Sequence, residues 1–117
     1  MRNKADQIEI KKSTPHIIVE IIEYVPNAVV SMTIIKKTTG NVTVTSMDAG
    51  EDLGEKTLAF DNYVQIIDGT AQVSINDKTY TLKLGEGITI PAHTKHRFNA
   101  AQQFKMLSTI IKSGFEG

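Results

Sequence analysis

The sequence contains no cysteine and no tryptophan, and neither charge sign is in excess. Without cysteine the chain can form no disulfide, no thiolate metal site and no thiol nucleophile. Thirteen basic and thirteen acidic residues give a formal net charge of zero. The composition therefore offers no electrostatic attraction to nucleic acid or to an anionic membrane, and we expect neither as a partner.

Long apolar runs are also missing. The stretch at residues 17–22 is interrupted by Glu20, and no segment has the length of a membrane span. The first residues are charged and lead into no apolar core of the kind that a secretory signal needs. These absences predict a cytoplasmic protein, and the length of 117 residues predicts a single domain over residues 1–117.

Short segments rich in β-branched residues alternate with turn residues along most of the chain. This pattern predicts an all-β protein with antiparallel strands. The clearest hairpin joins residues 71–75 to residues 78–82 through Asn76 and Asp77. Asn and Asp tolerate the positive φ angles of a two-residue turn, so we expect a tight hairpin here. Leu82 and Leu84 are expected to share one face of the second strand.

Residues 63–67 are apolar on both faces except at Gln65, which predicts a central strand. Side chains alternate between the two faces of a strand. If Asn62 points inward, Val64 does so too, and Tyr63 and Gln65 point away from the interior.

Two glycine-bounded motifs lie in the second half of the chain. The first runs from Gly50 to Gly69, and the second from Gly85 through Pro91 to His96. Their order and spacing resemble the two sequence motifs of the cupin superfamily, in particular small bacterial cupins of the cupin type-2 conserved-barrel kind. The resemblance covers about residues 40–111. It implies a cupin double-stranded β-helix, that is, an antiparallel jelly-roll barrel.

In metal-binding cupins these motifs supply three imidazoles and a carboxylate, a set that suits Mn, Fe, Ni, Zn or Cu. The resemblance puts those four places at Lys56, Leu58, Asn62 and His96. Leu58 has no donor atom, and Asn62 offers a carbonyl oxygen at best. A Lys56 ammonium about 5 Å from a divalent ion would repel it by roughly 6 kcal/mol at an effective dielectric constant of about 20. We therefore expect a degenerate metal site, with no metal and no other cofactor.

The same places provide the candidate ligand-binding residues. His96 is expected at the inner wall of the barrel, as a general base or a ligand-binding group, or as a remnant that hydrogen-bonds a neighbour. Asn62 is the second polar group of the site. His93 precedes His96 by three residues in a predicted loop. It is a weak candidate for a metal pair with His96 and is expected to be a solvated loop residue.

Three further residues complete the candidate ligand-binding set. Lys56 can pair with an anionic ligand or with Asp61, or simply face solvent. Leu58 replaces a donor by an apolar side chain inside the barrel. Met106 can fill the core or line a cavity, where its flexible thioether adapts to apolar ligands.

Residues 14–24 are the ambiguous segment. Their isoleucines fit one face of a helix, but the isoleucine and valine content favours a strand, packed on the barrel or on a partner subunit. Residues 17–22 and 104–111 both carry apolar side chains on two faces. This predicts a homodimer, with exchange of terminal strands as one form of it. The alternative is that a second sheet of the same chain covers both faces.

Three functions are compatible with these features. The favoured one is a non-enzymatic cupin that binds a small, partly apolar or carbohydrate-like molecule in its barrel. The alternative is an enzyme, either a metal-free acid–base isomerase or epimerase that uses His96, or a metal enzyme that uses His93 and His96. The third is a structural or regulatory dimer whose surface matters more than its cavity.

Overall fold

The computed structural model describes residues 9–112. Over that range it is almost entirely β-structure, with one short 3-10 helix, and none of its helices is long and apolar enough to cross a membrane. The elements are η2 (Ile18–Glu20), β1 (Val29–Lys37), β2 (Gly40–Met47), β3 (Lys56–Thr57), β4 (Asn62–Gly69), β5 (Ala71–Ile75), β6 (Lys78–Leu82), β7 (Gly87–Ile90), β8 (Lys95–Asn99) and β9 (Phe104–Ile111).

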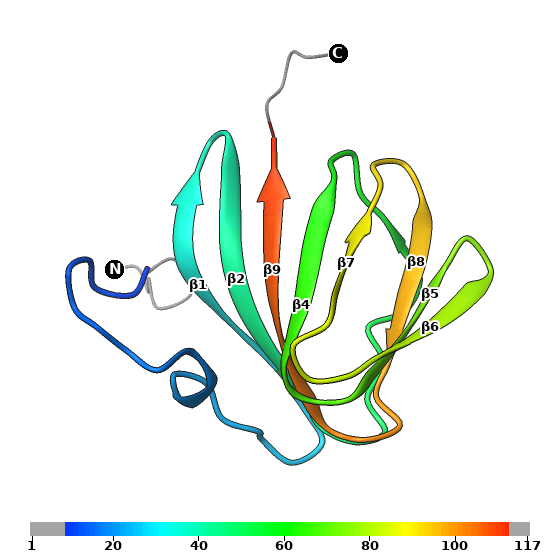
Figure 1. The fold of residues 1–117 in the computed structure, drawn as a ribbon, viewed down its shortest axis with the longest axis horizontal. Coiled ribbons are helices and arrows are strands. Elements are labelled where there is room, and N and C mark those ends of the chain that lie inside the picture. The colour runs from blue at the N-terminus through cyan, green and yellow to red at the C-terminus, as the bar shows by residue number, and fades with distance from the viewer. Residues whose placement is uncertain (1–8, 113–117) are drawn as a thin grey trace.

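The strands form two facing antiparallel sheets (Figure 1). One sheet has five strands in the order β1-β2-β9-β4-β7, and the other has four in the order β3-β8-β5-β6. From β2 to β9 the chain alternates between the two sheets. Only the β5–β6 hairpin joins two consecutive strands of the same sheet. This is the predicted all-β jelly-roll barrel, and the prediction is confirmed.

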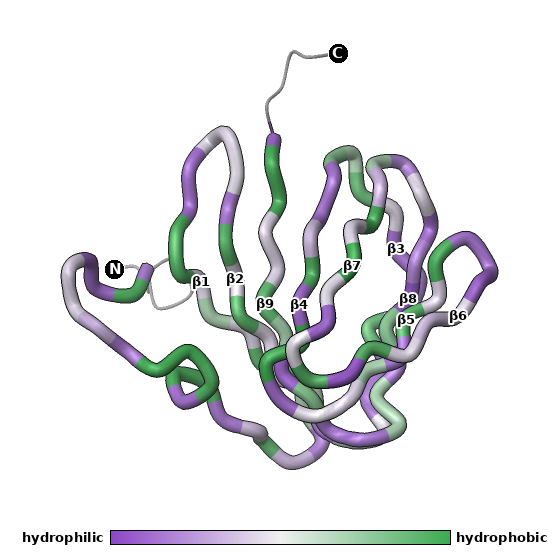
Figure 2. Tube along the Cα trace, viewed as in Figure 1, coloured by the Kyte–Doolittle hydropathy of each residue, from purple (hydrophilic) through white to green (hydrophobic). Residues whose placement is uncertain are grey.

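The core lies between the two sheets. Alternation along β4 buries Asn62, Val64 and Ile66 on the inner face and leaves Tyr63 44% exposed on the outer face, as predicted. Figure 2 shows how hydrophobic and hydrophilic residues follow one another along the strands. Burial of one large apolar side chain such as Phe104 stabilises the fold by roughly 2–3 kcal/mol. The apolar inner faces therefore hold the two sheets together.

The β5–β6 hairpin has the predicted ends and turn. Asn76 and Asp77 have φ angles of 52° and 72°, as a two-residue turn of this kind requires. The expectation for Leu84 was wrong. Leu82 is buried, but Leu84 lies beyond the end of β6, where the chain turns, and is 65% exposed.

Gly69 ends β4 and closes the first sequence motif. Its φ angle is +77°, and a Cβ atom at this position would overlap the carbonyl oxygen of Gln103. Both the backbone angle and the close approach to β9 favour glycine. The closing glycine of the motif is therefore a requirement of the corner between β4 and β5.

Residues 14–24 form no strand, so this prediction was wrong. The segment contains η2 and lies against the outer face of the five-stranded sheet, outside the barrel (Figure 1). Ile22 is 3% exposed there, and Ser46 Oγ of β2 donates a 2.9 Å hydrogen bond to the carbonyl of Glu23. Ile22 is packed by side-chain contact against a complete sheet, which needs no pairing with a neighbouring strand, whereas Ile17 is 59% exposed.

The same segment covers one end of β9. Lys105 points to the outer face yet is only 8% exposed, and its Nζ donates a 2.7 Å hydrogen bond to the carbonyl of Val19. The ammonium lies 4.9 Å from the centroid of the Tyr24 ring. Tyr24 Oη donates a 2.5 Å hydrogen bond to Asp68 Oδ2, and burial together with this carboxylate raises the pKa of Tyr24. The outer face of β9 is thus partly covered by the chain's N-terminal segment and not by a second sheet.

Candidate functional site

The structure brings Lys56 and His96 together. They stand opposite one another in the β3–β8 pair, and opposite residues of an antiparallel pair project from the same face. His96 is 6% exposed, and its ring meets Phe98 edge-on with a centroid distance of 6.2 Å. Lys56 lies at the rim and is exposed. The inner face of the four-stranded sheet therefore presents an imidazole with an ammonium beside it.

The hydrogen bond of His96 fixes which ring nitrogen is free. Its Nδ1 lies 3.2 Å from the carbonyl oxygen of Thr94. A carbonyl oxygen can only accept, so Nδ1 carries the proton and the lone pair of the neutral ring lies on Nε2. The expected bond to a neighbour thus exists, but it involves Nδ1 and leaves Nε2 to interact with a ligand.

Asn62 is the polar group of the facing sheet. It stands between Ile90 of β7 and Ile110 of β9 and is 6% exposed. Among residues 9–112 its Oδ1 has no hydrogen-bond partner. A buried carbonyl oxygen without a partner costs about 1–3 kcal/mol, and folded proteins rarely leave one. This acceptor is therefore available to a hydrogen-bond donor from outside the chain, either water or a ligand.

The residues at the four cupin ligand places do not fit a divalent metal. Lys56, Leu58, Asn62 and His96 supply one imidazole, one amide, an ammonium and an apolar side chain. Within the described range of residues 9–112, no three His, Cys, Asp or Glu side chains come together. His93 lies in the β7–β8 turn with a φ angle of 61° and is exposed.

Backbone hydrogen bonds hold the rim of the site. The His93 amide donates a 2.7 Å bond to the carbonyl of Leu58, and the Ala92 amide donates a 2.8 Å bond to Asp61 Oδ1. Leu58 is half-buried at this rim. Of the alternatives for Lys56, the ion pair with Asp61 is not formed among residues 9–112, and the Asp61 carboxylate caps the β7–β8 turn.

Met106 lies away from these residues. It is 5% exposed, stands opposite Ile66 and belongs to the apolar core. Ile110, which stands opposite Asn62, lies four residues further along β9, or roughly 13 Å at the rise of an extended strand. The structure therefore places Met106 in the core below the site.

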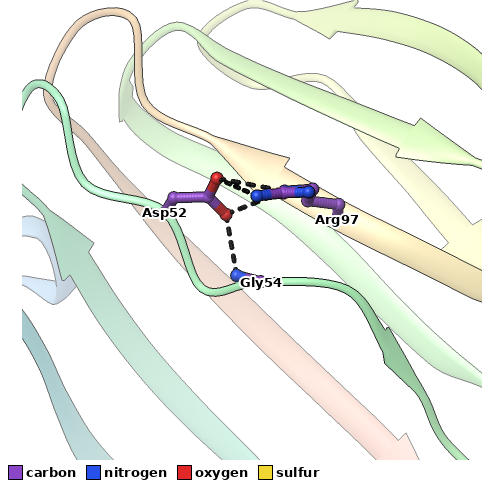
Figure 3. A network of polar contacts seen from close by, with 3 residues as sticks. All are labelled: Asp52, Gly54 and Arg97. Carbon is purple, nitrogen blue, oxygen red and sulfur yellow. Dashed lines mark hydrogen bonds and ion pairs between the residues drawn. The ribbon is translucent and has the colours of Figure 1, made fainter.

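The ion pair between Asp52 and Arg97, which the sequence did not indicate, holds the loop that leads to Lys56. Arg97 Nε lies 3.0 and 3.1 Å from the two carboxylate oxygens of Asp52, and its Nη2 lies 2.7 Å from Oδ2 (Figure 3). Asp52 Oδ1 also accepts a 2.7 Å bond from the Gly54 amide. The Arg97 guanidinium, followed by this amide, lowers the pKa of Asp52. The loop before β3 is thereby attached to β8, which places Lys56 beside His96.

A hollow of about 280 Å³ lies next to this ion pair. Ser74 of β5 and Lys95 and Arg97 of β8 line this hollow, and their side chains point away from the barrel interior. The hollow therefore opens on the outer face of the four-stranded sheet. Its full lining is Glu55, Ser74, Asn76, Asp77, Lys95, His96 and Arg97. Acidic and basic side chains are mixed there, unlike in the barrel interior.

Comparisons with known proteins agree with this description. Residues 63–109 match the family of AraC-like ligand binding domains. No protein with a curated description matches the chain.

Solved structures share the fold over most of the chain. A conserved protein of unknown function from Streptococcus pyogenes is 26% identical, with 90% of this chain and 92% of that one covered and a TM-score of 0.84. A cupin superfamily protein from Desulfitobacterium hafniense DCB-2 is 24% identical, with 89% and 95% covered and a TM-score of 0.82. A cupin 2 conserved barrel domain protein from Leptotrichia buccalis is 28% identical, with 80% and 46% covered and a TM-score of 0.78. The chain therefore has the cupin jelly-roll fold, and the solved structures that share it include cupin superfamily proteins.

Proposed function

We propose that this protein binds a small molecule between Asn62 of one sheet and His96 of the other, and catalyses no reaction there. The site lies at the end of the barrel where β4 begins and β9 ends, which we call the open end. The observation that carries the proposal is the buried Oδ1 of Asn62, which has no partner among residues 9–112. The match of residues 63–109 to a family of ligand binding domains supports it.

The polar groups of the site determine which hydrogen-bonding groups a complementary ligand carries. Asn62 Oδ1 is an acceptor, and the neutral His96 ring offers a second acceptor at Nε2. The side chains of Ile90 and Ile110, which stand opposite Asn62, are apolar, and Leu58 lies at the rim. A complementary ligand therefore carries hydroxyl or N–H donors on a small, partly apolar body.

The surroundings of His96 favour binding over acid–base catalysis. Catalytic histidines are usually oriented and activated by a carboxylate, but the His96 Nδ1 proton goes to the Thr94 carbonyl. Asp61, the carboxylate nearest to Asn62 in sequence, is engaged by the Ala92 amide. Among residues 9–112, His96 is thus bonded to no carboxylate that would orient and activate it as an acid–base catalyst.

The test is a fragment screen followed by amide chemical shifts of the labelled protein. Binders are expected to shift the amides of Asn62 and His96, and binding is expected to be lost in Asn62→Leu and in His96→Phe. Asn99→Leu, an exposed position at the end of β8, is the matched control and should bind normally. Binders that act at another face and ignore both inner-face substitutions would refute the proposal. A turnover that His96→Phe abolishes would replace it with an enzyme.

We also propose that two copies associate through the outer face of the five-stranded sheet. Ile35 and Tyr63 are 42% and 44% exposed on this face, although both are large apolar or aromatic side chains. Sedimentation of the wild-type protein is expected to give a dimer, and Tyr63→Lys a monomer. Leu84→Lys, at an exposed position in the turn after β6, is the control. A wild-type monomer would refute this association.

A further inference from the structure

The inner face of the open end carries positive charge and amides. One row of residues crosses the five-stranded sheet at this level, and each member is paired in register with the next. In strand order the row reads Lys36, Asn41, Ile110, Asn62 and Ile90. The facing sheet adds Lys56 beside His96. Neither set contains a carboxylate, so an entering ligand meets ammonium groups from both sheets.

Lysines continue around the rim next to this row. A hollow of about 680 Å³ is lined by Lys36, Lys37, Thr38, Thr39 and Lys112. The Lys112 amide donates a 2.7 Å bond to the Thr39 carbonyl, and its ammonium lies 5.8 Å from the centroid of the Phe60 ring. These contacts connect the β1–β2 turn, the end of β9 and the turn before β4, so the lysines share one end of the barrel.

The lysines at this end form no close ion pairs among the described residues. Within residues 9–112, the ammonium groups of Lys36, Lys37 and Lys112 have no carboxylate within 4.0 Å. Glu9 and Asp61 are the acidic neighbours. The Glu9 carboxylate is bonded to the Lys12 ammonium and to the backbone amide of Lys36, and Asp61 Oδ1 accepts a bond from the Ala92 amide. The whole chain has a formal net charge of zero, so this is a local excess.

From this arrangement we infer that the ligand carries a carboxylate or another oxoanion, held at the rim by Lys56, in addition to a hydroxyl or N–H donor for Asn62. The inference rests on the proposed binding site. It also fixes the orientation of the ligand. Asn62 Oδ1 is an acceptor and would repel an anion, so the donor end points inward to Asn62 and the anionic end stays with the lysines.

The rim lysines act on the rate of capture more than on the contact itself. Lys36, Lys37 and Lys112 concentrate anions at the open end, and such steering is weakened by salt over a Debye length of about 10 Å at 0.1 M. Lys56, whose flexible side chain starts beside His96, makes the direct contact.

Mandelate and mandelamide form a suitable probe pair. Both carry a hydroxyl on a small apolar body, but only mandelate carries a negative charge. Titration of the labelled protein with mandelate is expected to shift the amides of Lys56, Asn62 and His96, with an affinity about fivefold or more above that of mandelamide at low salt. The preference for the anion is expected to shrink between about 20 and 200 mM salt.

Substitution separates this inference from the proposed function. Lys56→Met is expected to remove the preference for mandelate, whereas Lys83→Met, at an exposed loop lysine, is expected to keep it. Equal binding of the two probes, lost in Asn62→Leu, would overturn the anion inference and leave the binding site standing. If neither probe shifts the amides of Asn62 and His96 at the highest soluble concentration, both the inference and the site it rests on are wrong for this class of ligand.

Discussion

Replacing Asn62 by leucine is expected to stabilise the ligand-free protein and to abolish ligand binding. The two side chains have nearly the same shape, but leucine has no polar atom. Asn62 is 6% exposed, and its Oδ1 lacks a partner among residues 9–112. A residue kept for function at a cost in stability is common at binding sites.

The magnitude follows from the burial of the amide oxygen. An unpartnered buried acceptor costs about 1–3 kcal/mol, and leucine removes this cost. The new methyl groups would lie beside Ile90 and Ile110, which stand opposite position 62. Leucine has the same branched skeleton as asparagine but a larger volume, so repacking offsets part of this gain. We expect the free energy of unfolding to rise by about 1 kcal/mol and the melting temperature by about 4 °C.

Urea unfolding of the ligand-free protein measures this change. Asn99→Leu is the control, because Asn99 is exposed and its replacement should change the free energy of unfolding by less than about 0.5 kcal/mol. A loss of about 1 kcal/mol or more in Asn62→Leu would refute the reasoning. It would mean that the amide of Asn62 makes hydrogen bonds that the fold depends on.

Three further substitutions test the structure around the site. Gly69→Ala is expected to lower the free energy of unfolding, measured by urea denaturation, by about 2 kcal/mol or more, because φ is +77° and an added Cβ would overlap backbone atoms. Gly50→Ala is the control: φ is +89° but no atom lies near the added Cβ, so this substitution measures the cost of the backbone angle alone. Tyr24→Phe loses the bond to Asp68 and about 1 kcal/mol at pH 7. Since folding raises the pKa of Tyr24, its contribution is complete below pH about 10 and is lost as pH rises through the folded pKa, so the alkaline decline in stability should shrink in Tyr24→Phe. Arg97→Gln is expected to speed hydrogen exchange in the loop before β3, and unchanged exchange would show that its ion pair does not hold this loop.

The strands and the clearest hairpin could be predicted because they depend on local rules. Period-two alternation identifies the inner face of β4, and the residues Asn76 and Asp77 specify the turn between β5 and β6. The spacing of the glycines reflects corners such as Gly69, where a side chain has no room. Motif and fold therefore agree in this part of the chain.

The N-terminal segment could not be predicted in the same way. Its isoleucine content is equally compatible with a hydrogen-bonded strand and with an irregular segment whose side chains pack on a complete sheet. Its backbone is held by Ser46 and Lys105, which follow it in the sequence by more than twenty and eighty residues respectively. Contacts of this range leave no local pattern to detect.

The site was predictable in part. The motif spacing selects Lys56 and His96, and the structure pairs these two residues across β3 and β8. It does not reveal that Asn62 Oδ1 is unpartnered, because that depends on every side chain around it. The ion pair of Arg97 with Asp52 joins residues 45 positions apart and is equally invisible in the sequence.

The most direct test of the central claim is elemental analysis of the purified, untagged protein after incubation with Mn, Fe, Ni, Cu or Zn and dialysis. The claim is that Lys56, Asn62 and His96 form a site for an organic ligand, because their donor set does not suit a divalent ion. It predicts well below one metal per chain, with no difference between the wild-type protein and His96→Ala. Close to one metal per chain, lost in His96→Ala, would contradict it.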